Sequence, residues 1–135
     1  MADSGNPRRP FYEHLGLEVV SSGEGRSVVR LPDNPALHNS RGDVHGGAIT
    51  TLLDAAMSSA ARAAIDPGFG SASIQFTTHF LIPGRGTLRA EGRVIRAGSS
   101  VVTAEAQATD AAGNLVASAL GTMKVIRPRA APARR

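Results

Sequence analysis

Short apolar runs between polar residues predict β-strands in the first third of the chain. Residues 17–22 and 26–31 are both short strand candidates, and the glycine-containing turn between them favours a hairpin. The preceding residues 11–17 carry apolar side chains at helical spacing, which predicts a short helical turn packed on the body. Residues 31–44 are rich in Pro, Asn, Asp and Gly and therefore predict an irregular loop.

A nearly continuous apolar segment follows and predicts one long helix. It begins at about His45 and ends near Ile65, where Asp66-Pro67-Gly68 stops it, and Asp43 is expected to cap its start. Because apolar residues cover most of the helical wheel, the helix must be enclosed by protein on nearly all sides. These residues are Ala48, Ile49, Leu52, Leu53, Ala55, Ala56, Met57, Ala60, Ala61, Ala63 and Ala64.

After the helix the pattern changes to a period of two. Four segments show it, residues 71–83, 86–98, 99–113 and 114–126, and the short turns between them predict an antiparallel meander. One face of each strand should lie on the core and the other largely in water. The sequence thus predicts an α+β fold in which about six antiparallel strands curl around one long helix.

Composition limits the architecture to a single compact unit. A chain of 135 residues with 41% hydrophobic content can build one real core. We expect a disordered leader over residues 1–10, one domain over 11–126 and a basic disordered tail over 127–135. The absence of cysteine excludes disulfides and thiolate zinc sites. Without an apolar secretory or membrane-spanning stretch, we expect a cytoplasmic protein that does not bind membranes.

The positive net charge does not indicate nucleic-acid binding. Four arginines lie in residues 127–135, and without them the chain has 11 basic against 11 acidic residues. The chain also has one Tyr, four Phe and no Trp, so it offers few aromatic side chains on which bases could stack. We therefore expect no nucleic-acid partner.

A single acid interrupts the apolar helix. Asp54 is the only charged residue between Gly46-Gly47 and Arg62. A buried ionised carboxylate is costly unless a partner, water access or a raised pKa relieves it, and all three occur at catalytic sites. A buried polar residue without a catalytic role is the alternative. The isolation of Asp54 makes it the first candidate for a working group.

The glycine pair at the helix start is the second candidate feature. Unpaired N–H groups there, together with the helix dipole, can stabilise negative charge on a carbonyl oxygen, although such a pair can also serve close packing alone. Gly46 and Asp54 lie ~12 Å apart along a helix. One carbonyl cannot easily reach both groups in a single subunit. If they act together, a two-fold dimer would create two equivalent sites at the subunit boundary.

The segment HNSRGDVHGGAITTLLDAA resembles the signature of hotdog-fold acyl-CoA thioesterases of the phenylacetate-pathway (PaaI-like) type. The residues that carry the resemblance are Asn39, then His45-Gly46-Gly47, then Asp54. The resemblance covers residues 11–126. It implies the hotdog fold, an antiparallel sheet wrapped around one long central helix, and a homodimer that pairs into a homotetramer. Acyl-CoA is the implied substrate.

The resemblance also implies roles for individual residues. Asp54 would be the nucleophile or the general base for water, and the Gly46 amide would polarise the thioester carbonyl. His45 and Asn39 would shape that pocket, and Ser73 would hold the attacking water. We expect no cofactor and no metal, since the other histidines lack ligand spacing. Further candidates for substrate contacts are Gly47, Ser58, Arg85, Ser99 and Ser100.

Two other functions remain open from the sequence. A hotdog hydratase or dehydratase would act on the α and β carbons of the acyl group, and it would need a histidine and an acid across them. A non-catalytic acyl-CoA-binding or regulatory module would use Asp54 only as a buried polar residue. The scarcity of aromatic residues does not distinguish aryl from aliphatic acyl groups.

Overall fold

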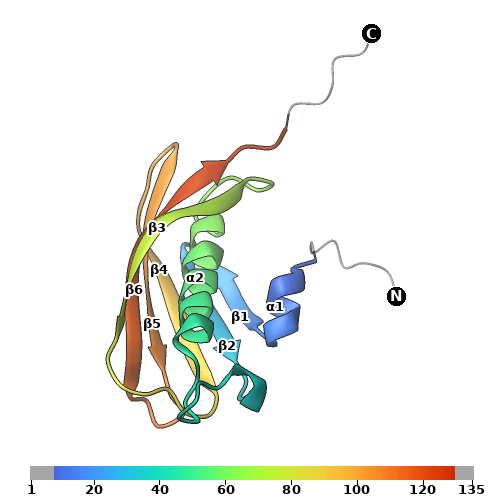
Figure 1. Cartoon of the computed structure of the whole chain (residues 1–135). Helices are drawn as coiled ribbons and strands as arrows, with labels where there is room; N and C mark the ends of the chain where they lie inside the picture. The colour runs from blue at the N-terminus through green and yellow to red at the C-terminus, as the bar shows by residue number, and fades with distance from the viewer. Residues whose placement is uncertain (1–7, 130–135) are drawn as a thin grey trace.

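A six-stranded antiparallel sheet curves around one long helix in the computed structural model, which describes residues 8–129 (Figure 1). The strand order is β1-β2-β4-β5-β6-β3. This confirms the predicted α+β class and the number of strands. Within the described residues the elements are α1 (Pro10–Leu15), β1 (Glu18–Gly23), β2 (Arg26–Leu31), the 3-10 helix η1 (Pro35–Leu37), α2 (Gly46–Arg62), β3 (Gly70–Phe80), β4 (Leu88–Ala97), β5 (Val101–Thr109) and β6 (Leu115–Ile126).

The expected leader and tail fall mainly outside the described residues. Residues 1–7 and 130–135 are not described, and α1 begins at Pro10, the last residue of the expected leader. No helix within residues 8–129 is long and apolar enough to span a membrane.

The predicted meander of the last four strands is wrong at β3. This strand pairs with β6 at one edge of the sheet, whereas β4 lies between β2 and β5. Residues 81–87 therefore lead from the edge of the sheet to its middle, and Pro83-Gly84 is part of this crossing and not of a tight hairpin. Alternation fixes the face on which each side chain lies, but it does not decide which strands pair.

The sheet covers most of α2 and leaves one stripe of the helix partly open. The faces against the sheet are buried, from Ala48 to Ala61. Five of the positions that are not buried recur every three or four residues and so share one side of the helix. We call them the open stripe: Gly47, Thr51, Asp54, Ser58 and Arg62. The predicted near-complete enclosure of the helix is therefore wrong on the side that carries Asp54.

The start of α2 is capped by His45 and not by Asp43 as predicted. His45 Nδ1 accepts a hydrogen bond from the Gly47 N–H at 2.8 Å. Backbone hydrogen bonds from Val44 to Gly84 and from His45 to Leu37 fix the preceding loop, so Asp43 lies too early to cap the helix. Its buried carboxylate instead accepts a hydrogen bond from Arg85 Nε at 2.8 Å.

Helix α2 lies so close to β4 that Gly92 has no room for a side chain. A Cβ there would lie 2.2 Å from the Ala56 carbonyl oxygen and 2.6 Å from Ser27 Oγ. The Ser27 hydroxyl donates to the same carbonyl at 2.6 Å. This contact fixes the distance between α2 and the sheet, and with it the position of Asp54.

We expect Gly92→Ala to lower the free energy of unfolding by at least about 2 kcal/mol, because the helix must move away from the sheet. Urea unfolding measures the change. Gly23→Ala is the control, since nothing lies within 4 Å of a Cβ at Gly23. Equal effects of the two changes would contradict the proposed close packing.

Candidate active site

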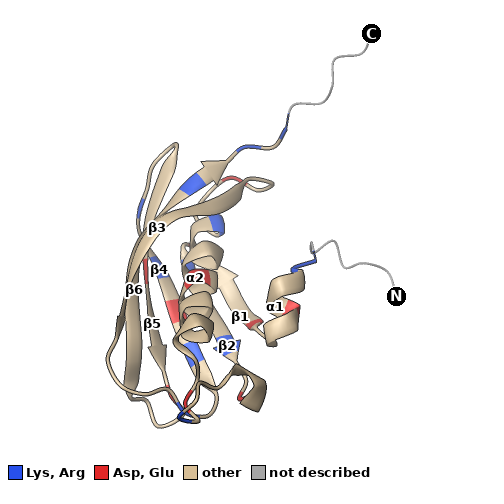
Figure 2. Ribbon diagram, in the orientation of Figure 1, with Lys and Arg blue, Asp and Glu red and all other residues tan. Residues whose placement is uncertain are grey.

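Asp54 lies midway along α2 in a hollow of about 510 Å³ between this helix, the N-terminal segment with α1, and the start of β3. Figure 2 shows this acid as the red segment of α2, which contains no other Asp or Glu. We call this cavity the acid hollow. Its lining residues are Arg9, Pro10, Phe11, Tyr12, Asp54, Ser58, Arg62, Gly70, Ser71 and Ser73.

The acid hollow brings three of the predicted site residues together. Ser73 Oγ donates to Asp54 Oδ1 at 2.5 Å. Ser58 lies one turn beyond Asp54 on the open stripe and lines the same cavity. Among the described residues none donates a hydrogen bond to Asp54 Oδ2, so this oxygen can bind a water molecule or approach a substrate.

A β-bulge in β3 aims Ser73 at the acid. The pairing with β6 shifts between Ser73 and Gln75, which leaves Ile74 as the extra residue. Ser73 pairs with the buried Met123, and Phe76 pairs with Gly121 on the same inner face. If the same sequence paired with β6 without a bulge, strict alternation from Phe76 would turn Ile74 inward and Ser73 outward.

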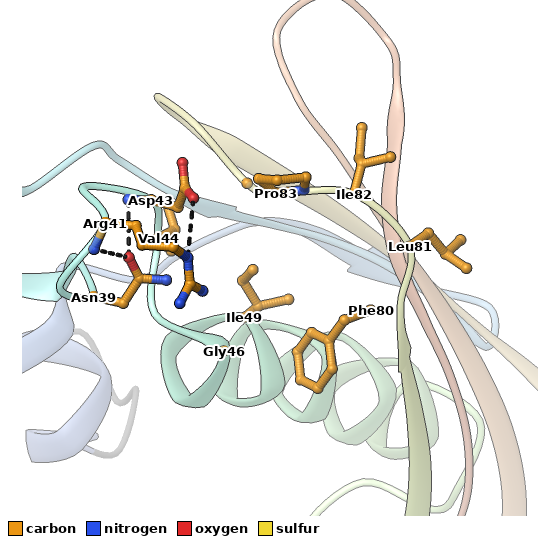
Figure 3. A pocket seen from close by; sticks show the side chains of 11 residues that line it. Asn39, Arg41, Asp43, Val44, Gly46, Ile49, Phe80, Leu81, Ile82 and Pro83 are labelled. Carbon is orange, nitrogen blue, oxygen red and sulfur yellow. Dashed lines mark hydrogen bonds and ion pairs between the residues drawn. The ribbon is translucent and has the colours of Figure 1, made fainter.

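Gly46 lies at the start of α2 in a second cavity, of about 330 Å³ (Figure 3). Among the described residues its N–H has no hydrogen-bond partner. It is one of the free donors at a helix N-terminus, where the helix dipole is positive. We call this cavity the amide hollow; it is lined by Asn39, Arg41, Asp43, Val44, Gly46, Ile49, Phe80, Leu81, Ile82, Pro83 and Gly84.

Asn39 holds the loop that leads to Gly46. Its Oδ1 accepts hydrogen bonds from the N–H groups of Arg41 at 2.9 Å and Asp43 at 3.1 Å, and Asn39 lines the amide hollow (Figure 3). His45 lines a different cavity, next to Phe11 and η1. The Gly47 N–H donates a hydrogen bond to His45 Nδ1 and is therefore not available to a substrate. The Gly46 N–H is not used by this cap.

The remaining predicted contacts lie away from Asp54. Arg85 is exposed and hydrogen-bonded to Asp43, and this bond raises the pKa of the Arg85 guanidinium. Ser99 and Ser100 lie in the exposed turn between β4 and β5. None of these three residues lines the acid hollow or the amide hollow.

Two residues of the acid hollow escaped the sequence prediction. Burial, followed by the nearby Asp54 carboxylate, raises the pKa of the Tyr12 phenol. Arg62 follows Asp54 by eight residues on the open stripe, so helical spacing alone could have indicated it. No comparable signal exists for Tyr12, because the docking of α1 next to α2 depends on contacts distant in sequence.

Residues 41–117, more than half of the chain, match the thioesterase superfamily. The chain belongs to this superfamily. Two relatives of this superfamily member are named for hydrolytic activity. A candidate esterase of Halobacterium salinarum is 36% identical over 124 residues, which cover 84% of this chain and 82% of the relative. A 1,4-dihydroxy-2-naphthoyl-CoA hydrolase of Listeria monocytogenes is 28% identical over 120 residues, which cover 88% and 98%.

Solved structures confirm that this superfamily member has the hotdog fold and is PaaI-like. The Escherichia coli PaaI protein of the phenylacetic acid degradation operon is 25% identical, with a TM-score of 0.81 over 88% of this chain and 86% of PaaI. The BH2602 protein of Bacillus halodurans, solved with CoA, is 29% identical, with a TM-score of 0.83 over 90% of this chain and 82% of that protein.

Proposed function

We propose that the protein is an acyl-CoA thioesterase that hydrolyses a thioester to the free acid and CoA. The observation that carries the proposal is the pair of complementary half-sites on α2. Asp54, held by Ser73, supplies an anionic oxygen, and the unpaired Gly46 N–H supplies a donor for a developing oxyanion. A relative named as an acyl-CoA hydrolase and a similar protein solved with CoA support this assignment of the substrate.

The two half-sites come from different subunits in this proposal. Within one subunit Gly46 and Asp54 line separate hollows and lie ~12 Å apart along the helix axis. A carbonyl needs its donor and its attacking oxygen each about 3 Å away. A second copy of the chain must therefore bring its Gly46 next to Asp54.

Strand β3 offers the edge along which the second copy would bind. Within the described chain it pairs on one side only, with β6, and its side chains Ile74 and Phe80 are 58% and 55% exposed. An unpaired apolar edge of this kind favours pairing with another strand. A β3–β3 contact around a two-fold axis would give a continuous sheet across a homodimer, and two such dimers would form the proposed homotetramer.

One half-site lies next to each end of β3. Ser73 contacts Asp54 near one end, and the Phe80 ring lies 3.4 Å from a Cβ built on Gly46 at the other. In an antiparallel β3–β3 pair, the Phe80 end of one strand lies opposite the Ser73 end of its partner. The partner's Gly46 amide would then approach Asp54, as a composite site requires.

In the proposed reaction, Asp54 either takes a proton from a water molecule that attacks the thioester carbonyl or attacks the carbonyl itself. The carbonyl oxygen gains negative charge and accepts a hydrogen bond from the Gly46 N–H. The bond to sulfur then breaks, and CoA leaves as a thiolate. If Asp54 is the nucleophile, water hydrolyses the resulting anhydride and restores the carboxylate.

A panel of aryl, short-chain and long-chain acyl-CoA thioesters tests the proposal, with detection of free thiol. We expect release of CoA from at least one class at a rate well above the spontaneous one. If every thioester stays intact, the thioesterase proposal is wrong. Tight binding without thiol release would then indicate the acyl-CoA-binding module, and hydration of an enoyl-CoA would indicate the hydratase.

A further inference from the structure

Arg62 places an unpaired positive charge in the acid hollow. The side chain is half-buried and lies on the open stripe, eight residues after Asp54. Among the described residues no carboxylate lies within ion-pair distance of its guanidinium. Burial, followed by the nearby Arg9, lowers the pKa of this guanidinium. A half-buried cation without an acidic partner destabilises the protein unless something else compensates its charge.

The rest of the hollow adds positive charge and hydrogen-bond donors. Arg9 lines the same cavity and lies over the Tyr12 ring, 5.8 Å from its centroid, so two cations stand against the one carboxylate of Asp54. Among the described residues the Tyr12 hydroxyl has no hydrogen-bond partner. Ser71 does not belong to this group, because its hydroxyl donates to the Ser58 carbonyl at 3.3 Å. The hollow therefore presents unused donors next to the candidate catalytic acid.

The position of Arg62 fits contact with the acyl part of a thioester better than contact with CoA phosphates. Arg62 begins ~12 Å along the axis from Asp54, and the side chain leans back toward it, because Cα–Cβ bonds tilt toward the helix N-terminus. The guanidinium is therefore within one aryl ring or a short alkyl chain of the reacting carbonyl. The CoA phosphates lie beyond the whole pantetheine arm, on the other side of the sulfur.

We infer that the acid hollow selects an acyl group whose far end carries a carboxylate, which Arg62 and Tyr12 bind. The inference rests on the proposed thioesterase function and specifies its substrate class. Charge-assisted hydrogen bonds from the guanidinium to the carboxylate would compensate the unpaired cation. The second carboxylate oxygen can accept a hydrogen bond from the Tyr12 hydroxyl.

Matched thioester pairs test this inference. Adipoyl-CoA and hexanoyl-CoA differ by a terminal carboxylate, and 4-hydroxybenzoyl-CoA and benzoyl-CoA differ by a phenolic oxygen. We expect the wild type to prefer adipoyl-CoA over hexanoyl-CoA. Arg62→Met should lower kcat/KM for adipoyl-CoA by about 10- to 100-fold and change hexanoyl-CoA by less than about threefold. The phenol pair is the uncharged control, and the selectivity between its two members should not depend on Arg62.

Further variants separate substrate binding from a structural role of Arg62 as the cation in the last turn of α2. Arg62→Lys keeps the charge and should restore part of the selectivity. Arg30→Met removes an exposed charge outside the hollow, one that pairs with Glu18 on β1, and the selectivity ratio should stay unchanged. Thermal unfolding of each variant shows whether it is folded at the assay temperature.

Three results would overturn the inference. The first is a wild type that cleaves thioesters without preferring adipoyl-CoA over hexanoyl-CoA. The second is an Arg62→Met variant in which all four substrates lose activity equally, since this would indicate a structural role or contact with CoA. The third is an unchanged selectivity ratio in that variant. By contrast, a wild type that cleaves none of the four or of the wider panel contradicts the proposed function itself.

Discussion

Asp54→Asn is expected to lower kcat/KM for the preferred thioester by about 10²- to 10⁴-fold, the contribution of a positioned general base or nucleophile. The amide has the shape of the carboxylate, and its oxygen can still accept the hydrogen bond from Ser73. The variant should therefore keep the fold and bind acyl-CoA with nearly the affinity of the wild type. Free-thiol release measures the loss, and calorimetric titration with acyl-CoA measures the binding.

Ser73→Ala is the informative companion variant. It removes the donor to Asp54 Oδ1 but leaves the carboxylate, so turnover should fall by a smaller factor than in Asp54→Asn. An Asp54→Asn variant that keeps more than about a tenth of wild-type kcat/KM would show that this carboxylate is not the reacting group.

Gly46→Pro is expected to lower kcat by about 10²- to 10³-fold, because it deletes the one N–H that the proposal assigns to the oxyanion. Proline is well tolerated at the first position of a helix. The preceding His45, with φ of −59° and ψ of 137°, already has a conformation that proline permits in its neighbour. Steady-state kinetics measures the loss, and thermal unfolding verifies the fold.

Gly46→Ala is the matched control for the loss of the amide hydrogen. It keeps the N–H, and its Cβ would make an ordinary contact with the Phe80 ring at 3.4 Å. We expect it to keep most of the activity. If Ala and Pro at this position reduce kcat equally, crowding next to Phe80 and not the missing donor explains the loss.

Mixing the two inactive variants tests whether the site is shared between subunits. A mixed dimer of Asp54→Asn and Gly46→Pro contains one site with both defects and one site with none. Random reassociation of equal amounts should therefore restore about one quarter of wild-type activity for a two-fold interface. Activity that stays at the level of the separate variants after verified exchange of subunits would show that each site lies within one chain.

Much of the fold followed from local patterns. The long apolar segment and the four alternating segments after it predicted α2 and β3 to β6 with bounds within a few residues of those observed. The partner of β3 was not predictable in this way, since alternation is the same for a strand at the edge and one in the middle of a sheet. The cap was missed for a related reason, because backbone hydrogen bonds from distant loops decide where α2 begins.

The candidate site was predictable where one helix carries it. Asp54 and Gly46 stand out because α2 is otherwise apolar, and their spacing is fixed by the helical rise. Tyr12 could not be predicted, because it reaches the acid hollow only through the docking of α1. Ser73 was indicated by the family resemblance, but its orientation toward Asp54 depends on a bulge that alternation does not reveal.

The bulge at Ile74 makes the pairing register of β3 a matter of chemistry as well as of packing. If regular alternation continued from Phe76 past this point, Ile74 would lie opposite Met123, and an aliphatic side chain would take the place where the Ser73 hydroxyl now meets the carboxylate. Natural insertions and deletions should therefore accumulate in the loops beyond β3 and spare the strand itself. During the divergence of this lineage, a slip of the register at that point would exchange a wet, polar environment of the acid for a dry one.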